Sequence, residues 1–305
     1  MEALVGYTGF VGSNIYDKGN FDAVYNSRNI EDAYGSKPQL LIYAGLRAEK
    51  YLANHDPGKD MEMIEQAEKN IEEISPEKLV LISTIDVLKD PRGQDENSQV
   101  DLENLQAYGY NRYQLEKWVR EHYPNSLIVR LPALFGKNIK KNFIYDFINI
   151  IPFMLTVDKM RELQVSDNKI IENYELKDNG FYKLKNLSKE EKERLREKFK
   201  KVGFSALNFT DSRSIFQFYN LENLWRDIKI ALDADLKLLH LATEPISIGE
   251  LYIYLTGKEF DNELKGTPIV HGYKTIHYHL YGGKNGFICD KNSIMKDIKN
   301  FVLEK

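Results

Sequence analysis

The sequence lacks the features that mark several protein classes. Among its 305 residues it has a single cysteine, Cys289, so no disulfide can form within the chain, which is typical of the reducing cytoplasm. Its 42 basic and 46 acidic residues nearly balance, and the net charge of -4 gives no field that would attract nucleic acid or an acidic membrane. The most apolar stretch, residues 143–157, contains Asp146 and is too short to span a bilayer. We therefore expect a cytoplasmic protein with no nucleic-acid or membrane partner.

The sequence also gives little support for a metal site. Near its C-terminal end it contains His271, His277 and His279. Residues two apart simply share one face of a strand. Neither a cysteine nor a carboxylate stands at the spacing that a metal centre requires. We predict no metal site.

A glycine-rich turn directly follows the first apolar run. Residues 3–5 are typical of a strand, three glycines follow at three-residue spacing, and residues 10–16 are compatible with a helix. Such a turn presents backbone N–H groups and a positive helix end to a pyrophosphate. The first glycine permits the tight turn, the second lets the backbone approach the phosphates, and the third lets the helix pack on its strand. We predict that this turn binds a dinucleotide through Gly6, Thr8, Gly9, Phe10, Val11 and Gly12.

The next strand indicates which dinucleotide is bound. Residues 21–25 lead into Asn26, Ser27 and Arg28, where an NAD site carries an acidic residue; Asp22 stands at the wrong end of the strand. A hydroxyl and a guanidinium suit the 2′-phosphate of NADP, since arginine binds phosphate through two donors. We predict NADP, with NAD as the alternative, and contacts from Asn26, Ser27 and Arg28.

The pattern of elements predicts an α/β fold. Residues 40–44 and 79–82 are continuous apolar runs typical of buried parallel strands, and residues 60–74 show helical spacing. Strands alternating with helices predict a doubly wound parallel sheet. The first of these runs leads into Ala44, Gly45 and Leu46, which we expect beside the nicotinamide end of the cofactor.

The composition changes after residue 136. A charged helix is expected at 186–201, with Ser188 as its N-cap and Glu191 three residues later. We predict a dinucleotide-binding domain from residues 1–136 and 206–242, and a second, smaller mixed α/β lobe for the substrate from residues 137–205 and 243–305.

The end of the 79–82 strand and the helix after it carry the most specific pattern. The strand leads into Thr84, and Tyr108 stands four residues before Arg112 on the predicted helix, so the two side chains share one face. This pattern resembles the extended short-chain dehydrogenases/reductases, the nucleotide-sugar epimerases, dehydratases and reductases, in which a strand-end hydroxyl meets a tyrosine four residues ahead of a lysine. Tyr113 with Lys117 is a second register that restores the lysine.

We choose Tyr108 because the residues around it follow the family's spacing. Gly109 stands next to it, Glu116 follows eight residues on, and residues 128–132 carry Arg130 where the family has it. This last match is closest to the reductases of 4-keto-6-deoxy nucleotide sugars.

The resemblance implies a Rossmann fold and a catalytic set of Thr84, Tyr108 and Arg112. In this set Tyr108 moves a proton and Thr84 hydrogen-bonds the reacting oxygen. Arg112 replaces the family's lysine, orients the cofactor ribose and favours the phenolate, but it cannot relay a proton because arginine does not lose one. Substrate contacts are expected from Arg47, Thr84, Asp86, Tyr108, Asn142 and Arg213.

The resemblance favours an NADP-dependent reductase that acts on the keto group of a nucleotide sugar. A dehydratase is disfavoured, because Ile85 and Asp86 follow Thr84 where those enzymes carry an Asp-Glu pair. A nucleotide-sugar 4-epimerase with tightly bound NAD is one alternative. A non-catalytic NADP(H)-binding sensor or scaffold is another, since Arg112 and Phe216 depart from the family pattern. The resemblance also implies a homodimer.

Overall fold

The computed structural model describes residues 1–177 and 180–305, which form two compact units. The first unit comprises residues 1–139, 215–246 and 269–301, and the second comprises residues 140–214, 247–268 and 302–305. The sequence had placed all of residues 243–305 in the second lobe. Residues 269–301 instead group with the first unit, where the amide of Gln217 bonds both backbone groups of Tyr273 and the N–H of Ile288 donates to the carbonyl of Ala242.

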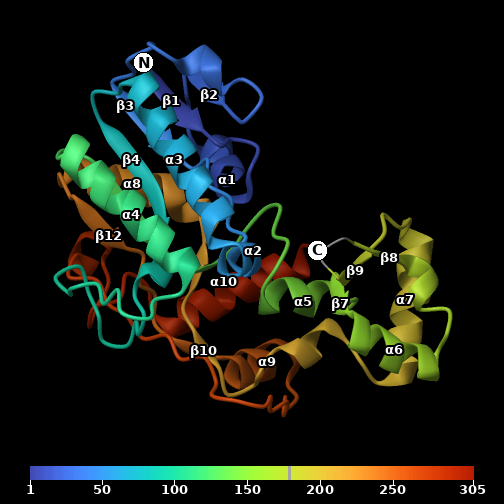
Figure 1. Ribbon diagram of the computed structural model, residues 1–305. Coiled ribbons are helices and arrows are strands. Elements are labelled where there is room, and N and C mark those ends of the chain that lie inside the picture. The colour runs from blue at the N-terminus through green and yellow to red at the C-terminus, as the bar shows by residue number, and fades with distance from the viewer. Residues whose placement is uncertain (178–179) are drawn as a thin grey trace. The chain divides into compact units, whose positions relative to one another are not determined.

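A six-stranded parallel sheet forms the centre of the first unit, with strand order β12-β5-β4-β3-β1-β2 (Figure 1). The strands are β1 (Glu2–Val5), β2 (Ala23–Tyr25), β3 (Leu40–Tyr43), β4 (Leu79–Thr84), β5 (Leu127–Leu131) and β12 (Leu238–His240). The order reverses between β1 and β3, and ligands of such sheets bind beyond the strand ends at this point. The predicted doubly wound parallel sheet is confirmed.

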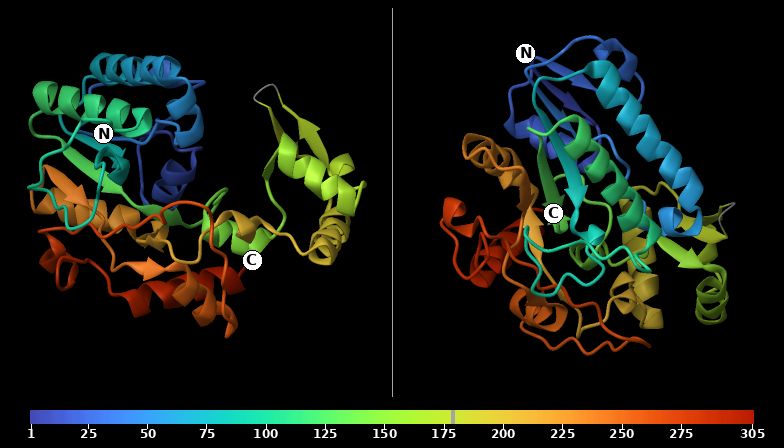
Figure 2. Two further views of the ribbon diagram at one scale, coloured as in Figure 1. Left: turned by 60° about the horizontal axis from the view of Figure 1, so that its bottom comes forward. Right: turned by 60° about the vertical axis from the view of Figure 1, so that its left-hand side comes forward.

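Helices cover both faces of this sheet (Figure 2). One face carries α1 (Phe10–Lys18) and α8 (Leu224–Asp233), and the other carries α3 (Pro57–Ile74) and α4 (Ala107–His122). Side chains alternate across each strand, so Leu4 packs toward α1 and α8 while its neighbours Ala3 and Val5 pack toward α3 and α4. Burial on both faces explains the continuous apolar runs in the sequence.

The first unit also contains α2 (Lys50–His55), the 3₁₀ turn η2 (Ile85–Val87) and the parallel pair β6 (Ala133–Phe135) and β11 (Phe218–Asn220). Most of the last helix, α10 (Lys291–Leu303), belongs to this unit, and its final residues are grouped with the second. A further short pair, β10 (Ile215–Phe216) and β13 (Ile246–Ser247), lies where the chain passes between the units.

The second unit has a hydrophobic core of its own. An antiparallel sheet of β7 (Met154–Thr156), β9 (Phe181–Leu184) and β8 (Tyr174–Leu176) packs with α6 (Val157–Ser166) and α7 (Lys189–Val202), and the unit also contains α5 (Phe143–Asn149) and α9 (Ile248–Thr256). Ser188 and Glu191 form the predicted capping box of α7, whose Leu195 and Phe199 are buried.

Across the described parts of the chain, no helix combines the length and the apolar character needed to cross a bilayer.

Candidate active site

The glycine turn after β1 lies at the point where the strand order reverses. Gly6 has a φ of +92°, and a Cβ placed there would lie 2.3 Å from the carbonyl oxygen of Ala44 at the end of β3. A Cβ on Gly12 would lie 2.1 Å from the Gly6 carbonyl oxygen, so the start of α1 packs directly on the turn. Gly9 is the N-cap of α1 and has no side chain with which to cap it. The helix therefore begins with uncapped N–H groups, as an anion site requires.

The other residues of the predicted turn differ in exposure. Thr8 and Gly9 are exposed, whereas Phe10 and Val11 are half-buried against the core beneath α1. Thr8 and the backbone of the turn thus face outward, and the two apolar side chains hold the first turn of α1 on the sheet.

The residues after β2 form a compact turn. The side-chain oxygen of Asn26 accepts from the N–H of Arg28 at 2.9 Å, and the N–H of Asn26 donates to Asn29 at 2.8 Å. Ser27 and Arg28 are exposed at this strand end. The carboxylate of Asp22 instead accepts from the N–H of Glu2 at the opposite end of the strands. Cationic and hydroxyl side chains therefore stand where a ribose-binding acid would.

The turn after β3 packs against β1. A Cβ on Gly45 would lie 3.1 Å from a methyl group of Val5, and the side chain of Leu46 packs on the core beneath α3 and α4. Arg47 is exposed, but its carbonyl oxygen accepts a hydrogen bond from Arg112 at 2.8 Å.

Gly109 brings the N-terminal end of α4 against the end of β4. A Cβ at this position would lie 2.0 Å from the carbonyl oxygen of Asp86, so only glycine permits the contact. The N–H of Tyr108 is held by the side chain of Asn54 at 2.9 Å. Local packing thus explains the Tyr-Gly pair in the sequence and fixes Tyr108 beside the strand-end turn.

Thr84 and Asp86 are bonded to each other at this strand end. The Thr84 hydroxyl accepts from the N–H of Asp86 at 3.2 Å and donates to its carboxylate at 3.3 Å. The same carboxylate forms an ion pair with Lys50, the first residue of α2, at 2.7 Å. Three polar side chains from β4, η2 and α2 are therefore joined.

Arg112 lies over the ring of Tyr108 and is paired with a carboxylate. The centre of its guanidinium is 4.1 Å from the ring centroid. It donates to Asp60 of α3, and the Asp60 carboxylate also accepts from Asn111 at 2.8 Å. Both members of the ion pair are only 3% exposed. The positive charge beside Tyr108 is therefore offset in part by its own partner.

The Tyr108 phenol carries its proton at neutral pH. Its pKa is raised to about 12, chiefly by burial; Arg112 lowers the pKa, whereas Asp86 and Asp60 raise it. A protonated phenol is a proton donor, which is the form that a carbonyl reduction uses.

The second register lies in a different setting. Tyr113 is half-buried in a separate apolar cluster with Ile85 and Val87, and Lys117 is exposed. The contact between a tyrosine ring and a cation four residues on is found for Tyr108 and Arg112. This geometry favours the register that the sequence analysis chose.

Two other positions of the family pattern are structural partners. Glu116 of α4 accepts from Arg130 of β5 at 3.0 and 2.6 Å, and from Ser83 at 2.6 Å. Burial would raise the pKa of Glu116, but the charge and hydrogen bonds of Arg130 lower it overall. The spacing of Glu116 and Arg130 thus reflects a buried ion pair that ties α4 to the sheet.

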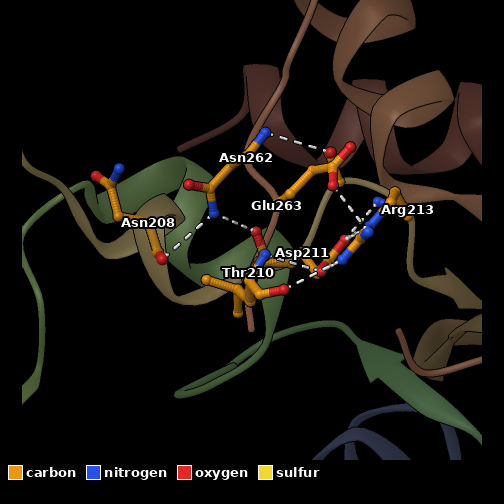
Figure 3. Close-up of polar contacts among 8 residues, drawn as sticks. Asn208, Thr210, Asp211, Arg213, Asn262 and Glu263 are labelled. Carbon is orange, nitrogen blue, oxygen red and sulfur yellow. Dashed lines mark hydrogen bonds and ion pairs between the residues drawn. The ribbon is translucent and has the colours of Figure 1, made fainter. Parts of the chain in front are cut away.

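Two of the predicted substrate residues belong to the second unit. Asn142 caps α5, since its side-chain oxygen accepts from the N–H groups of Ile144 and Tyr145. Arg213 lies between Asp211 and Glu263, with donor–acceptor distances of 2.7 to 3.0 Å to their carboxylates (Figure 3). Its guanidinium is thus bonded to two carboxylates of its own unit. Binding of a substrate phosphate by Arg213 stays a prediction.

The sequence analysis missed Asp60 and Lys50. Asp60 continues the apolar stripe of Ile64, Ala67 and Ile71 by one helical turn, and a carboxylate in such a stripe signals a buried partner. Lys50 follows a segment without clear periodicity, and nothing in its sequence neighbourhood indicated a contact with Asp86. The described residues contain no group of three or more histidine, cysteine or acidic side chains that could hold a metal ion.

Comparisons with known proteins agree with this architecture. No protein-family model matches the chain, and no curated protein matches its sequence. Its fold is similar to a dTDP-4-dehydrorhamnose reductase from Clostridium acetobutylicum, with a TM-score of 0.62 at 15% identity over 99% of this chain and 100% of that one. The Bacillus anthracis enzyme of the same name, solved with NADP, gives 0.61 at 16% over 99% and 98%.

An epimerase is also among the similar structures. A UDP-N-acetylglucosamine 4-epimerase from Methanobrevibacter ruminantium gives a TM-score of 0.59 at 11% identity over 99% of this chain and 98% of that one. At these identities the likeness establishes the fold. The chain therefore has the Rossmann-type architecture found in reductases and epimerases of nucleotide sugars.

Proposed function

We propose that this protein is an NADP-dependent oxidoreductase that reduces the keto group of a nucleotide sugar of the 4-keto-6-deoxy hexose type. The observation that carries the proposal is the buried Tyr108 beneath Arg112, on a helix that Gly109 holds against the backbone of Asp86, the residue to which Thr84 is hydrogen-bonded. The resemblance of the sequence and the folds of the two reductases support the choice of substrate class.

The residues of the glycine turn fit the pyrophosphate of such a cofactor. Gly6 and Gly12 leave no room for a Cβ, and the uncapped start of α1 offers N–H donors. Arg28 is exposed at the end of β2 and suits a 2′-phosphate. When bound, the reduced nicotinamide supplies the hydride for the keto carbon.

The chain's own residues then handle the oxygen of the keto group. For this the Thr84 hydroxyl would turn its single donor from the Asp86 carboxylate to this oxygen, and Tyr108 would give the oxygen a proton, so that an alcohol forms. The high pKa of Tyr108 matches this role, because the phenol must hold its proton until the carbonyl gains negative charge. The reductases among the similar structures support this reading over that of an epimerase.

One observation favours a second candidate, a non-catalytic NADP(H)-binding sensor or scaffold. Arg112 stands where the family has a lysine, and its charge is tied to Asp60 in a buried pair. A binding protein would need the cofactor contacts of the glycine turn but no proton transfer by Tyr108.

We further propose where the protein acts and how it assembles. The single cysteine and the balanced charge support a cytoplasmic site of action. A homodimer rests on the resemblance alone.

Oxidation of NADPH by the purified protein tests the function. With a 4-keto-6-deoxy nucleotide sugar we expect turnover that prefers NADPH to NADH. Tyr108→Phe should lower kcat by about 10²-fold or more, the usual contribution of a positioned proton donor. Tyr113→Phe is the matched control on the same helix and should retain activity.

Two other results would replace the proposal. No turnover, with NAD released only on denaturation, would identify an epimerase. No turnover, with weak reversible NADP(H) binding that Tyr108→Phe leaves unchanged, would identify the sensor.

A further inference from the structure

The positive charge that lies over Tyr108 is already engaged. Arg112 donates to the Asp60 carboxylate and to the carbonyl oxygen of Arg47, and the ion pair is 3% exposed on both sides. Its guanidinium stacks on the face of the Tyr108 ring. Because Asp60 is an acid of opposite charge in direct contact, Arg112 gives the phenol only part of the stabilisation that an unpaired cation would give.

A second carboxylate acts on the same phenol. Asp86 is fixed by two hydrogen bonds with Thr84, and its backbone carbonyl touches α4 at Gly109, directly after Tyr108. Its negative charge opposes ionisation of Tyr108. The cation paired with this carboxylate is Lys50, 2.7 Å away, with side chains that are 50% exposed for Lys50 and 28% for Asp86.

We propose that Lys50 is a positioning residue for Tyr108: by pairing with Asp86, whose backbone touches α4 next to Tyr108, it neutralises this carboxylate and supplies the charge balance that the Asp60-paired Arg112 gives only in part. The inference rests on the proposed function for the role of Tyr108 in turnover. According to this inference, a lysine contributes to the site from α2 through Asp86, whereas the helix position four residues after Tyr108 holds Arg112.

The charges around Tyr108 come from four elements. Arg112 belongs to α4, Asp60 to α3, Asp86 to η2 and Lys50 to α2. His271, from the segment 269–301, also responds to Asp86 and Lys50, but burial lowers its pKa and it is neutral at pH 7. The partly exposed Lys50–Asp86 pair can be altered by substitution without removing a member of the buried Arg112–Asp60 pair.

Opposite shifts are expected when either member of the pair is removed. Lys50→Met leaves Asp86 uncompensated and should raise the Tyr108 pKa by roughly one unit, while Asp86→Asn should lower it by roughly one unit. The double variant lacks both charges, and its Tyr108 pKa should return close to that of the unaltered protein. A structural disturbance alone would not produce shifts of opposite sign that cancel.

The test uses the full chain with 3-fluorotyrosine at position 108, whose ¹⁹F shift reports ionisation of this one phenol. Titrations compare the unaltered pair with Lys50→Met, Asp86→Asn and the double variant. Lys50→Arg retains the cation and should leave the titration unchanged. Lys89→Met removes a lysine from an exposed ion pair with Asp101 on the same unit, and it should also have no effect.

The inference would be overturned if the pKa of Tyr108 shifted in the same direction in Lys50→Met and Asp86→Asn, or did not shift in either. A shift of the same size in Lys89→Met would overturn it as well. The titration requires no turnover, so it stays decisive if the protein fails as a reductase. If the protein is a reductase, the alkaline limb of its kcat profile should move with the ¹⁹F titration in each variant.

Discussion

At Gly109 the backbone of α4 touches the carbonyl of Asp86, and a Cβ there would lie 2.0 Å from this oxygen. Gly109→Ala must therefore push α4 away from the end of β4, at a cost of about 1–3 kcal/mol in the free energy of unfolding. Denaturant unfolding measures this loss, and activity should fall with it because Tyr108 moves with the helix.

Gly58 provides the matched control for this substitution. It lies in the first turn of α3, and a Cβ there would meet nothing closer than 4.0 Å. Gly58→Ala should keep or raise stability, by up to about 1 kcal/mol from helix propensity. Equal stabilities of the two alanine variants would contradict the close contact at Gly109.

Arg112 shows where reasoning from the sequence reaches its limit at the scale of one residue. Its departure from the family's lysine was visible, and so was its position on the helix face of Tyr108. Its partner Asp60 lies 52 residues away in the sequence, and spacing carries no information about such a pair. The structure gives a physical reason for arginine, because its fork reaches Asp60 and the Arg47 carbonyl together, which a single ammonium does less well.

At the scale of the elements, His240 connects the edge strand β12 to β5 and to two loops. The ring is fully buried, with one nitrogen 3.2 Å from Arg130 of β5 and the other 3.1 Å from the carbonyl of Lys274. The backbone N–H of His240 donates to the carboxylate of Glu96, which also accepts from the hydroxyl of Thr275. The residue thus connects two strands and two loops.

The burial of His240 predicts a pH dependence of stability. Burial and the Arg130 charge lower its pKa from 6.5 to about 4, although Glu96 and Glu116 oppose the shift. Because the folded state resists protonation, the stability is complete above about pH 6.5 and is lost as the pH falls toward 4, by about 3 kcal/mol. Denaturant unfolding at a series of pH values measures this loss.

His240→Gln separates this effect from the titration of carboxylates. Glutamine keeps a donor and an acceptor but does not ionise. The variant should be less stable at pH 7 and should lose less stability between pH 6.5 and 4. Parallel pH profiles for the two proteins would show that His240 does not titrate in this range.

The elements of the first unit could be predicted better than those of the second. Buried parallel strands such as β3 and β4 are continuous apolar runs in the sequence. The start of α7 is marked by Ser188 as N-cap, with Glu191 three residues later. The strands β7 and β8 have three residues each, too few to show a period of two. Their antiparallel sheet depends on packing against α6 and α7, which no local pattern reveals.

Over the whole molecule, the sequence predicted two parts, and the compact units of the structure group residues 269–301 differently from that prediction. Residues 269–301 follow an irregular segment after α9, and its sequence does not indicate which part of the chain it packs against. They group with the first unit because Gln217 bonds the backbone of Tyr273 and because Glu96 bonds Thr275 and Ile276. These contacts join positions 56 to 180 residues apart in the chain, and no local sequence pattern carries information about them.

The two units should respond differently to the cofactor, since the glycine turn and Arg28 both belong to the first. NADPH at 100 times its Kd should add about 2.7 kcal/mol to the free energy of unfolding of that unit. Hydrogen exchange would show this as slower exchange in β1, β3 and β4, with β7 and β9 unchanged.

Arg28→Ala removes an exposed side chain, so it should leave the stability of the free protein unaltered and weaken protection by NADPH but not by NADH. Equal losses with both cofactors would remove the 2′-phosphate role from Arg28, and equal protection of both units would show that binding is not confined to the glycine turn.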